Sequence, residues 1–200
     1  MLSIAYFQEA EDLFEPVAAL NDPGVMASFR TGLCYTRQLL VKTRTKAQPG
    51  GVHEDMCFYF QTGTAQLMAL LDGMAVYVEK KIAVPPTSGR IYWANANTFL
   101  DPRFQDLRVI QQRTGGYVIK GGITANTLRN FSKHYLPWVP LSGDPGDGMY
   151  DIMFPINSGT KSGPVLSGLL FPLFNDAREA YLSLGKLLGQ PASETDVYAL

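Results

Sequence analysis

The sequence contains few of the residues that bind metals or act as nucleophiles. Two cysteines, Cys34 and Cys57, and two histidines, His53 and His134, occur among the 200 residues. Neither cysteine belongs to a CxxC pair or to the Cys/His spacing of a zinc site, so we expect no metal site and no cofactor. Because no secretory signal is visible, both thiols are expected to be reduced and buried.

Charged residues are also scarce, at 18% of the chain against about 25% in typical soluble domains. Hydrophobic residues make up 46% of the sequence, which is enough for one well-buried core. We therefore expect a single domain over residues 1–200, which could divide into lobes of residues 1–84 and 85–200. The low charge content is typical of a chain that buries part of its surface against partners.

No hydrophobic run is long enough to cross a membrane. The two most apolar stretches, residues 67–78 and 165–174, are short and interrupted by charged or helix-breaking residues, whereas a spanning helix needs about 20 apolar residues. Residues 1–12 carry acidic side chains and no Lys or Arg, unlike the start of a secretory signal. We expect a soluble protein with no membrane partner, in the cytoplasm or in a virion assembled there.

Recognisable catalytic signatures are missing as well. Residues 157–163 precede a helix that Pro164 could open, but they lack the glycines of a Walker A loop. Lys161 and Ser162 remain candidates for holding an anion at that helix N-terminus; a plain surface loop is the alternative. Ser167 lies outside any GxSxG pattern, so it is not a nucleophile elbow.

A short polar group, His53 with Glu54 and Asp55, precedes a run that alternates like a strand. On a strand, His53 and Asp55 would share a face and could form a hydrogen bond. Nothing else in the sequence predicts an acid/base pair, so we expect that the protein is not an enzyme.

The charges that are present are segregated along the chain. Residues 80–133 contain nine basic and two acidic residues, a local balance of +7, whereas the whole chain has a net charge of −1. The flanks therefore carry the compensating acids. The basic residues of this middle stretch are Lys80, Lys81, Arg90, Arg103, Arg108, Arg113, Lys120, Arg129 and Lys133.

A second basic segment covers residues 30–46, which hold five basic and no acidic residues. Cations near the end of a helix are stabilised by its macrodipole, and this is one interpretation; contact with phosphates is the other. The candidate residues for phosphate contact are Arg37, Lys42, Arg44 and Lys46.

Aromatic residues, among them Tyr92, Trp93 and Tyr117, alternate with the cations of the middle stretch. Nucleic-acid binding uses cations for phosphates and aromatic faces for unpaired bases. The same cations could bind an acidic protein surface, including that of another copy of this chain, or could form a solvated face without a ligand.

The predicted architecture is α+β, a helix-rich single domain with a small mixed β-sheet. Helices are expected at residues 7–20, 23–46, 64–81, 102–113, 124–135 and 164–189, the last kinked at Pro172. Strands are expected at residues 52–61, 90–95, 117–121 and 149–155.

These patterns favour a non-catalytic subunit of a larger intracellular nucleoprotein assembly that contacts the nucleic-acid backbone. The alternative is a structural protein, such as a phage or viral particle component, whose charge segregation serves contacts between subunits. An enzyme of unknown class ranks third. The predicted nucleic-acid-binding residues are Arg37, Lys42, Arg44, Lys46, Arg90, Arg103, Arg108, Arg113, Lys120, Arg129 and Lys133.

Overall fold

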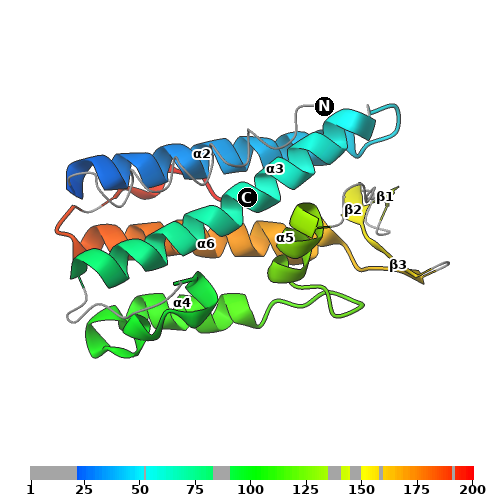
Figure 1. The fold of residues 1–200 in the computed structure, drawn as a ribbon. Helices are drawn as coiled ribbons and strands as arrows, with labels where there is room; N and C mark the ends of the chain where they lie inside the picture. Colours follow the sequence, from blue (N-terminus) through cyan, green and yellow to red (C-terminus); the bar gives the residue numbers. More distant parts are fainter. Residues whose placement is uncertain are drawn as a thin grey trace.

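The computed structural model describes residues 22–51, 53–82, 91–134, 141–144, 150–157, 160–190 and 192–200, and it is mostly helical (Figure 1). The predicted α+β class is wrong, because no mixed sheet occurs among these residues. The strands found there form two antiparallel pairs, each of two short strands. The helix predicted at residues 7–20 lies outside the described part of the chain.

The helices α2 (Asp22–Lys46) and α3 (His53–Tyr77) pack side by side as an antiparallel pair. The helix predicted at residues 23–46 is therefore confirmed. Phe29, Leu33 and Leu40 are buried at helical spacing on the inner face of α2. The two helices approach closely at Gly32, where an added Cβ would lie 2.6 Å from a methyl carbon of Leu70.

The strand predicted at residues 52–61 is wrong, because α3 already begins at His53. The alternation of Met56, Phe58 and Phe60 resembles a strand, but Met56 and Phe60 are also one helical turn apart. Both are buried in α3, whereas Phe58 points to solvent. The helix predicted at residues 64–81 is confirmed; α3 starts earlier and continues into a π-helical turn, Val78–Ile82.

The strand predicted at residues 90–95 is also wrong, since Trp93–Asn95 forms a 3-10 turn. The Trp93 amide donates to a side chain instead of a neighbouring strand: its acceptor is Asp72 Oδ1, at 2.8 Å. Further 3-10 turns, Asn97–Leu100 and Pro102–Phe104, lead into α4 (Gln105–Gly115). The helix predicted at residues 102–113 is confirmed.

No strand forms at residues 117–121, where a strand was predicted. One isolated bridge joins Ile119 to Ile123 across a tight turn in which Gly121 and Gly122 have φ angles of 94° and 73°. The next helix, α5 (Ala125–His134), begins as predicted after Thr124, whose Oγ1 accepts a hydrogen bond from the Thr127 amide.

Two small antiparallel strand pairs follow α5. Strand β1 (Leu141–Gly143) pairs with β2 (Asp151–Met153), and β3 (Pro155–Asn157) pairs with β4 (Thr160–Lys161). The strand predicted at residues 149–155 thus corresponds to β2 and the start of β3.

The helix predicted at residues 164–189 is confirmed as a π-helical turn, Leu166–Leu170, followed by α6 (Phe171–Leu187). The π turn ends at Leu170, two residues before Pro172, which has no backbone N–H to donate the usual hydrogen bond. Helix α6 packs against both α2 and α4, which lie on opposite sides of it (Figure 1). Among the described helices, none is long and apolar enough to span a bilayer.

Candidate functional site

Arg113 forms an ion-pair group between α4 and α6. Its Nη2 lies 2.5 Å from Asp176 Oδ1, and it also pairs with Glu179. Only 6% of the Asp176 side chain is exposed, so this carboxylate requires a compensating charge. The hydrogen bond to Asp176 raises the pKa of Arg113. The pKa of Tyr117 is also raised, mainly by burial and secondly by the Asp176 carboxylate. Arg113 thus joins two helices of the same chain.

Arg129 forms a second ion pair, between α5 and α3. Its Nη1 lies 3.1 Å from Asp72 Oδ2, and the exposed fractions of the two side chains are 21% and 14%. The guanidinium also lies over the ring of Tyr92, 5.4 Å from the centroid. Since Asp72 also accepts the hydrogen bond from the Trp93 amide, this contact ties together α3, α5 and the segment before α4.

The cations of the second basic segment contact groups near α2. Arg37 Nε donates to the carbonyls of residues 198 and 199, and Lys46 pairs with Asp55 over 3.0 Å. Lys42 Nζ lies 5.3 Å from the ring centroid of Tyr59, and Arg44 lies over Phe171. All four candidate residues of this segment therefore have contacts within the chain.

Of the remaining candidate cations, Arg103 forms an ion pair, whereas Arg108 and Lys120 form none with the described residues. Arg103 forms a local, exposed ion pair with Asp101 over 2.7 Å, and the hydrogen bond from Arg103 lowers the pKa of Asp101. Within the described part of the chain, Arg108 is partly exposed and Lys120 exposed, and neither forms an ion pair. Arg90 lies outside the described residues, as do the side chains of Lys133 and Lys161.

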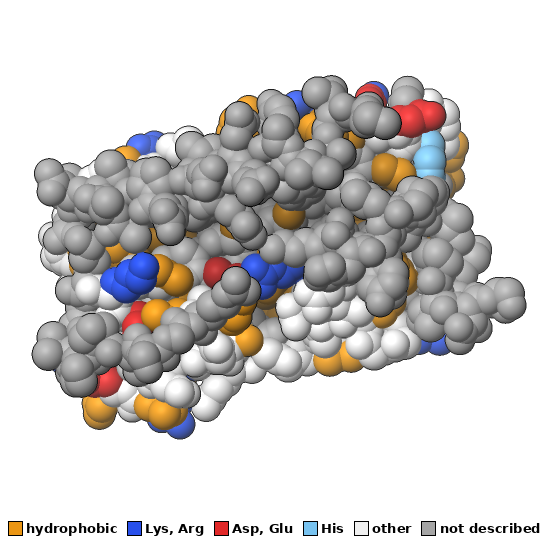
Figure 2. Space-filling model, viewed as in Figure 1, with side chains coloured by type: hydrophobic (Ala, Val, Ile, Leu, Met, Phe, Trp, Pro, Cys, Tyr) orange, Lys and Arg blue, Asp and Glu red, His pale blue; other side chains and the backbone are white. Residues whose placement is uncertain are grey.

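The basic residues of α2 and those at residues 103–113 lie on different sides of α6. Residues 30–46 lie on α2 and residues 103–113 on α4 or directly before it, and α6 separates these helices. On the face shown in Figure 2, the described Lys and Arg side chains form separate groups, some of them beside acidic side chains.

The predicted anion-binding loop is built around an acid from the chain itself. The amides of Leu166 and Ser167 donate to the Asp151 carboxylate over 2.7 and 2.9 Å, and Ser167 Oγ donates to it over 2.6 Å. Asp151 therefore occupies the helix N-terminus that was expected to bind an external anion. Ser162 is buried; its Oγ accepts from the Phe154 amide and donates to the Gly163 carbonyl.

The polar group at residues 53–55 lies in the first turn of α3, not on a strand. His53 and Asp55 therefore do not share a face. His53 Nε2 lies 3.6 Å from Cys57 Sγ, but burial and the nearby Glu54 raise the pKa of that thiol, which opposes thiolate formation. Among the described residues, no three His, Cys, Asp or Glu side chains are grouped as a metal site.

An exposed aromatic surface, absent from the sequence-based predictions, lies on the α2–α3 pair. The side chains of Tyr35 and Phe58 are each 62% exposed. Tyr35 lies two helical turns before Lys42 on the same side of α2. Phe58 contacts Tyr59 edge-on, with their ring centroids 5.6 Å apart, and Tyr59 in turn contacts Lys42. We call Tyr35, Lys42, Phe58 and Tyr59 the α2–α3 patch. A helical reading of residues 53–60 would have shown that Phe58 points outward.

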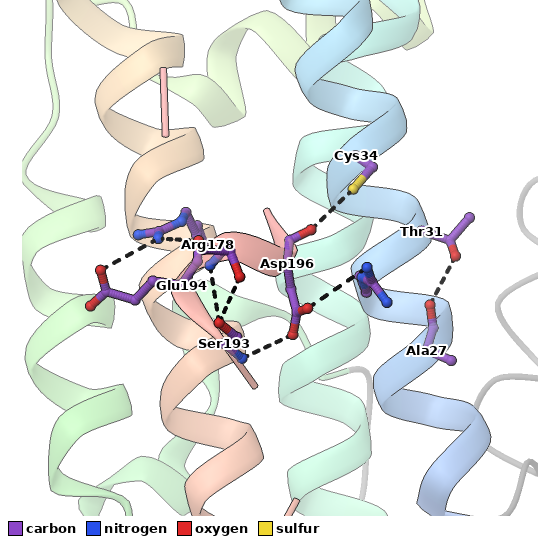
Figure 3. Close-up of polar contacts among 9 residues, drawn as sticks. Ala27, Thr31, Cys34, Arg178, Ser193, Glu194 and Asp196 are labelled. Atoms are coloured by element: carbon purple, nitrogen blue, oxygen red, sulfur yellow. Dashed lines mark hydrogen bonds and ion pairs between the residues drawn. The ribbon is translucent and has the colours of Figure 1, made fainter. Parts of the chain in front are cut away.

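Residues 192–200, which we call the return segment, run back between α2 and α6 (Figures 1 and 3). Arg178 of α6 donates to the carbonyls of Glu194 and Val197. The side-chain amide of Asn175 binds both the amide and the carbonyl of Leu200, each over 2.8 Å. No motif in the sequence predicts this arrangement, because it depends on two helices distant in sequence.

Comparison with protein-family models, curated proteins and solved structures gave no match. Function must therefore be inferred from the geometry described above.

Proposed function

We propose that this chain is a non-catalytic structural subunit that associates with other copies of itself through the α2–α3 patch. The observation that carries the proposal is the exposure of Tyr35 and Phe58 on two neighbouring helices, which Lys42 and Tyr59 join by a contact from α2 to α3. Aromatic residues are enriched in protein interfaces, where a few of them supply much of the binding energy.

The net charge supports association between identical copies. At a formal charge of −1 and a sequence pI near 6.1, copies of the chain repel one another only weakly at neutral pH. The ion pairs of Arg113 and Arg129 also support this choice over nucleic acid, since both cations already contact carboxylates of the same chain. Contact with nucleic acid is the other candidate, carried by the exposed Lys80 and Lys120 and by Arg108.

Sedimentation velocity over a range of protein concentrations tests the proposal. The wild type is expected to form oligomers as the concentration rises, and Phe58→Glu should raise the dissociation constant about tenfold or more, because it places a charge in the interface. The matched control is Val118→Glu, which alters a side chain of similar exposure in the segment after α4 and should leave association unchanged.

A wild type that stays monomeric at high concentration would overturn the proposal, as would equal effects of the two variants. Labelled RNA and DNA at low salt distinguish the other candidate. Binding that weakens with salt by a slope of about −0.9 per neutralised phosphate on duplex DNA, and that Phe58→Glu leaves unchanged, would favour nucleic acid as the ligand instead.

A further inference from the structure

The groove between α2 and α6 recognises the return segment mainly through its backbone. Asn175 pairs with both backbone groups of Leu200, Arg178 Nε donates to the Val197 carbonyl over 2.5 Å, and Arg37 donates to the Tyr198 carbonyl over 3.1 Å. In peptide recognition, hydrogen bonds to the main chain are a common source of affinity. The return segment is thus held between α2 and α6 largely by hydrogen bonds to its main chain.

Side chains of the return segment add two anchors. Val197 is almost completely buried, whereas Tyr198 is 67% exposed. Asp196 lies against α2: its carboxylate is 3.7 Å from Arg30, and its carbonyl accepts from Cys34 Sγ over 3.6 Å (Figure 3). The contacts therefore combine backbone hydrogen bonds, one apolar anchor and one exposed ion pair.

The connection between α6 and the return segment is short and sharply reversed. Gly189 has a φ angle of 65°, a left-handed conformation that suits the end of a helix. The chain then passes directly over Gly185, where an added Cβ would lie 2.7 Å from the Gln190 carbonyl oxygen. A change of backbone angles at this reversal is the rearrangement that would direct the return segment away from its own helices.

We propose that the return segment exchanges between copies, so that residues 192–200 of one chain occupy the α2–α6 groove of another. This inference rests on the proposed function, which brings copies together. Exchange re-forms between chains every contact that the segment makes within one chain. The free-energy cost of exchange therefore comes from changing the backbone at the reversal and from bringing two chains together. The second contribution is smaller where copies are already held close together.

Crosslinking between isotope-labelled copies tests the exchange. The Asp196→Cys substitution, in a Cys57→Ser background, places a second thiol beside the native Cys34. Unlabelled and ¹⁵N-labelled protein are mixed at low concentration, concentrated, and treated with a short bis-maleimide. Mass spectrometry then identifies the linked peptides. With complete exchange, about half of the 34–196 links should join one light and one heavy peptide; links that join only peptides of equal label would overturn the proposal.

The matched control is Gln112→Cys in the same background, which places the second thiol on the exposed surface of α4. Any mixed links that it forms with Cys34 measure random collision, and exchange requires a mixed fraction clearly above that level. Sedimentation of the same samples separates the two proposals. Oligomers without mixed 34–196 links would overturn the exchange alone, whereas a monomer without mixed links would overturn the proposed function as well.

Discussion

The cations on α4 and α5 differ from those on α2 in the groups they contact. Arg113 and Arg129 bind carboxylates that are largely buried, Asp176 and Asp72. On α2, Arg37 binds backbone carbonyls, Lys42 lies over a ring, and Lys46 pairs with a carboxylate that is about half exposed. Both sets appear in the sequence as clusters of positive charge, but they have different surroundings.

The difference shows that the burial of both members of an ion pair decides what a cation contributes. A buried carboxylate that loses its partner is left uncompensated in a medium of low dielectric constant, and this destabilises the fold strongly. An exposed pair is solvated and screened, so its loss changes little. The excess of positive charge at residues 80–133 therefore serves, in part, to neutralise acids that the fold brings in from α3 and α6.

Arg129→Met should produce the largest effect, because it removes a cation from beside the largely buried Asp72 carboxylate. We expect the free energy of unfolding to fall by roughly 3 kcal/mol, measured by urea denaturation. The matched control is Arg108→Met, which removes a partly exposed cation that forms no ion pair with the described residues and should change stability by less than about 0.5 kcal/mol.

A second substitution separates charge from packing at this site. In the Arg129→Met background, Asp72→Asn should recover part of the lost stability, because the largely buried negative charge is removed while the acceptor for the Trp93 amide remains. If Asp72→Asn lowers stability further in that background, or if Arg129→Met matches its control, the cations of the two regions do not differ in the way described.

Arg113→Met should lower stability by a smaller amount, about 2 kcal/mol, since this side chain is more exposed than Arg129. It also has a spectroscopic consequence. Arg113 lowers the pKa of Tyr117 while burial and Asp176 raise it, so removal of Arg113 should shift the Tyr117 titration to higher pH. Ultraviolet difference titration against the matching Tyr117→Phe variants measures this shift.

The sign of the associated pH dependence follows from the direction of that shift. Because the folded-state pKa of Tyr117 lies above the unfolded value of about 10, its contribution to stability is fully present below that pH. It is lost as the pH rises through the folded-state pKa. A Tyr117 titration that moves to lower pH in Arg113→Met would contradict the proposed contact.

The sequence predicted the helices well and the strands poorly. Long segments with helical spacing, such as residues 23–46 and 164–189, were confirmed because one apolar face of each had to be buried. Short aromatic runs were misread as strands. At residues 53–60, Met56 and Phe60 fit both periods, and only continuity with the following apolar positions favours a helix. At residues 90–95, the Trp93 amide finds its acceptor on Asp72, which lies 21 residues earlier.

The candidate site was less accessible to sequence reasoning, because pairing between distant residues sets the role of each cation. Residue counts located the positive charge but not the acids that neutralise it, such as Asp176 for Arg113. The anion-binding prediction was made from the right feature, a helix N-terminus, but Asp151 supplies the anion. The contacts of the return segment with α2 and α6 could not be predicted from a local motif, because many of them are made to its backbone carbonyls.

Lys46→Met should produce the smallest effect and complete the comparison. The ion pair between Lys46 and Asp55 is partly exposed on both sides, so its loss should reduce the free energy of unfolding by at most about 0.5 kcal/mol. Salt provides the sharper criterion. In about 1 M salt, where charges are screened over roughly 3 Å, this small difference from the wild type should vanish, whereas most of the Arg129→Met difference should remain because its partner is largely buried. Urea denaturation measures both differences in the free energy of unfolding, that of Lys46→Met and that of Arg129→Met from the wild type. If salt reduces the two equally, both ion pairs behave as surface pairs, and burial does not explain how the two groups of cations differ.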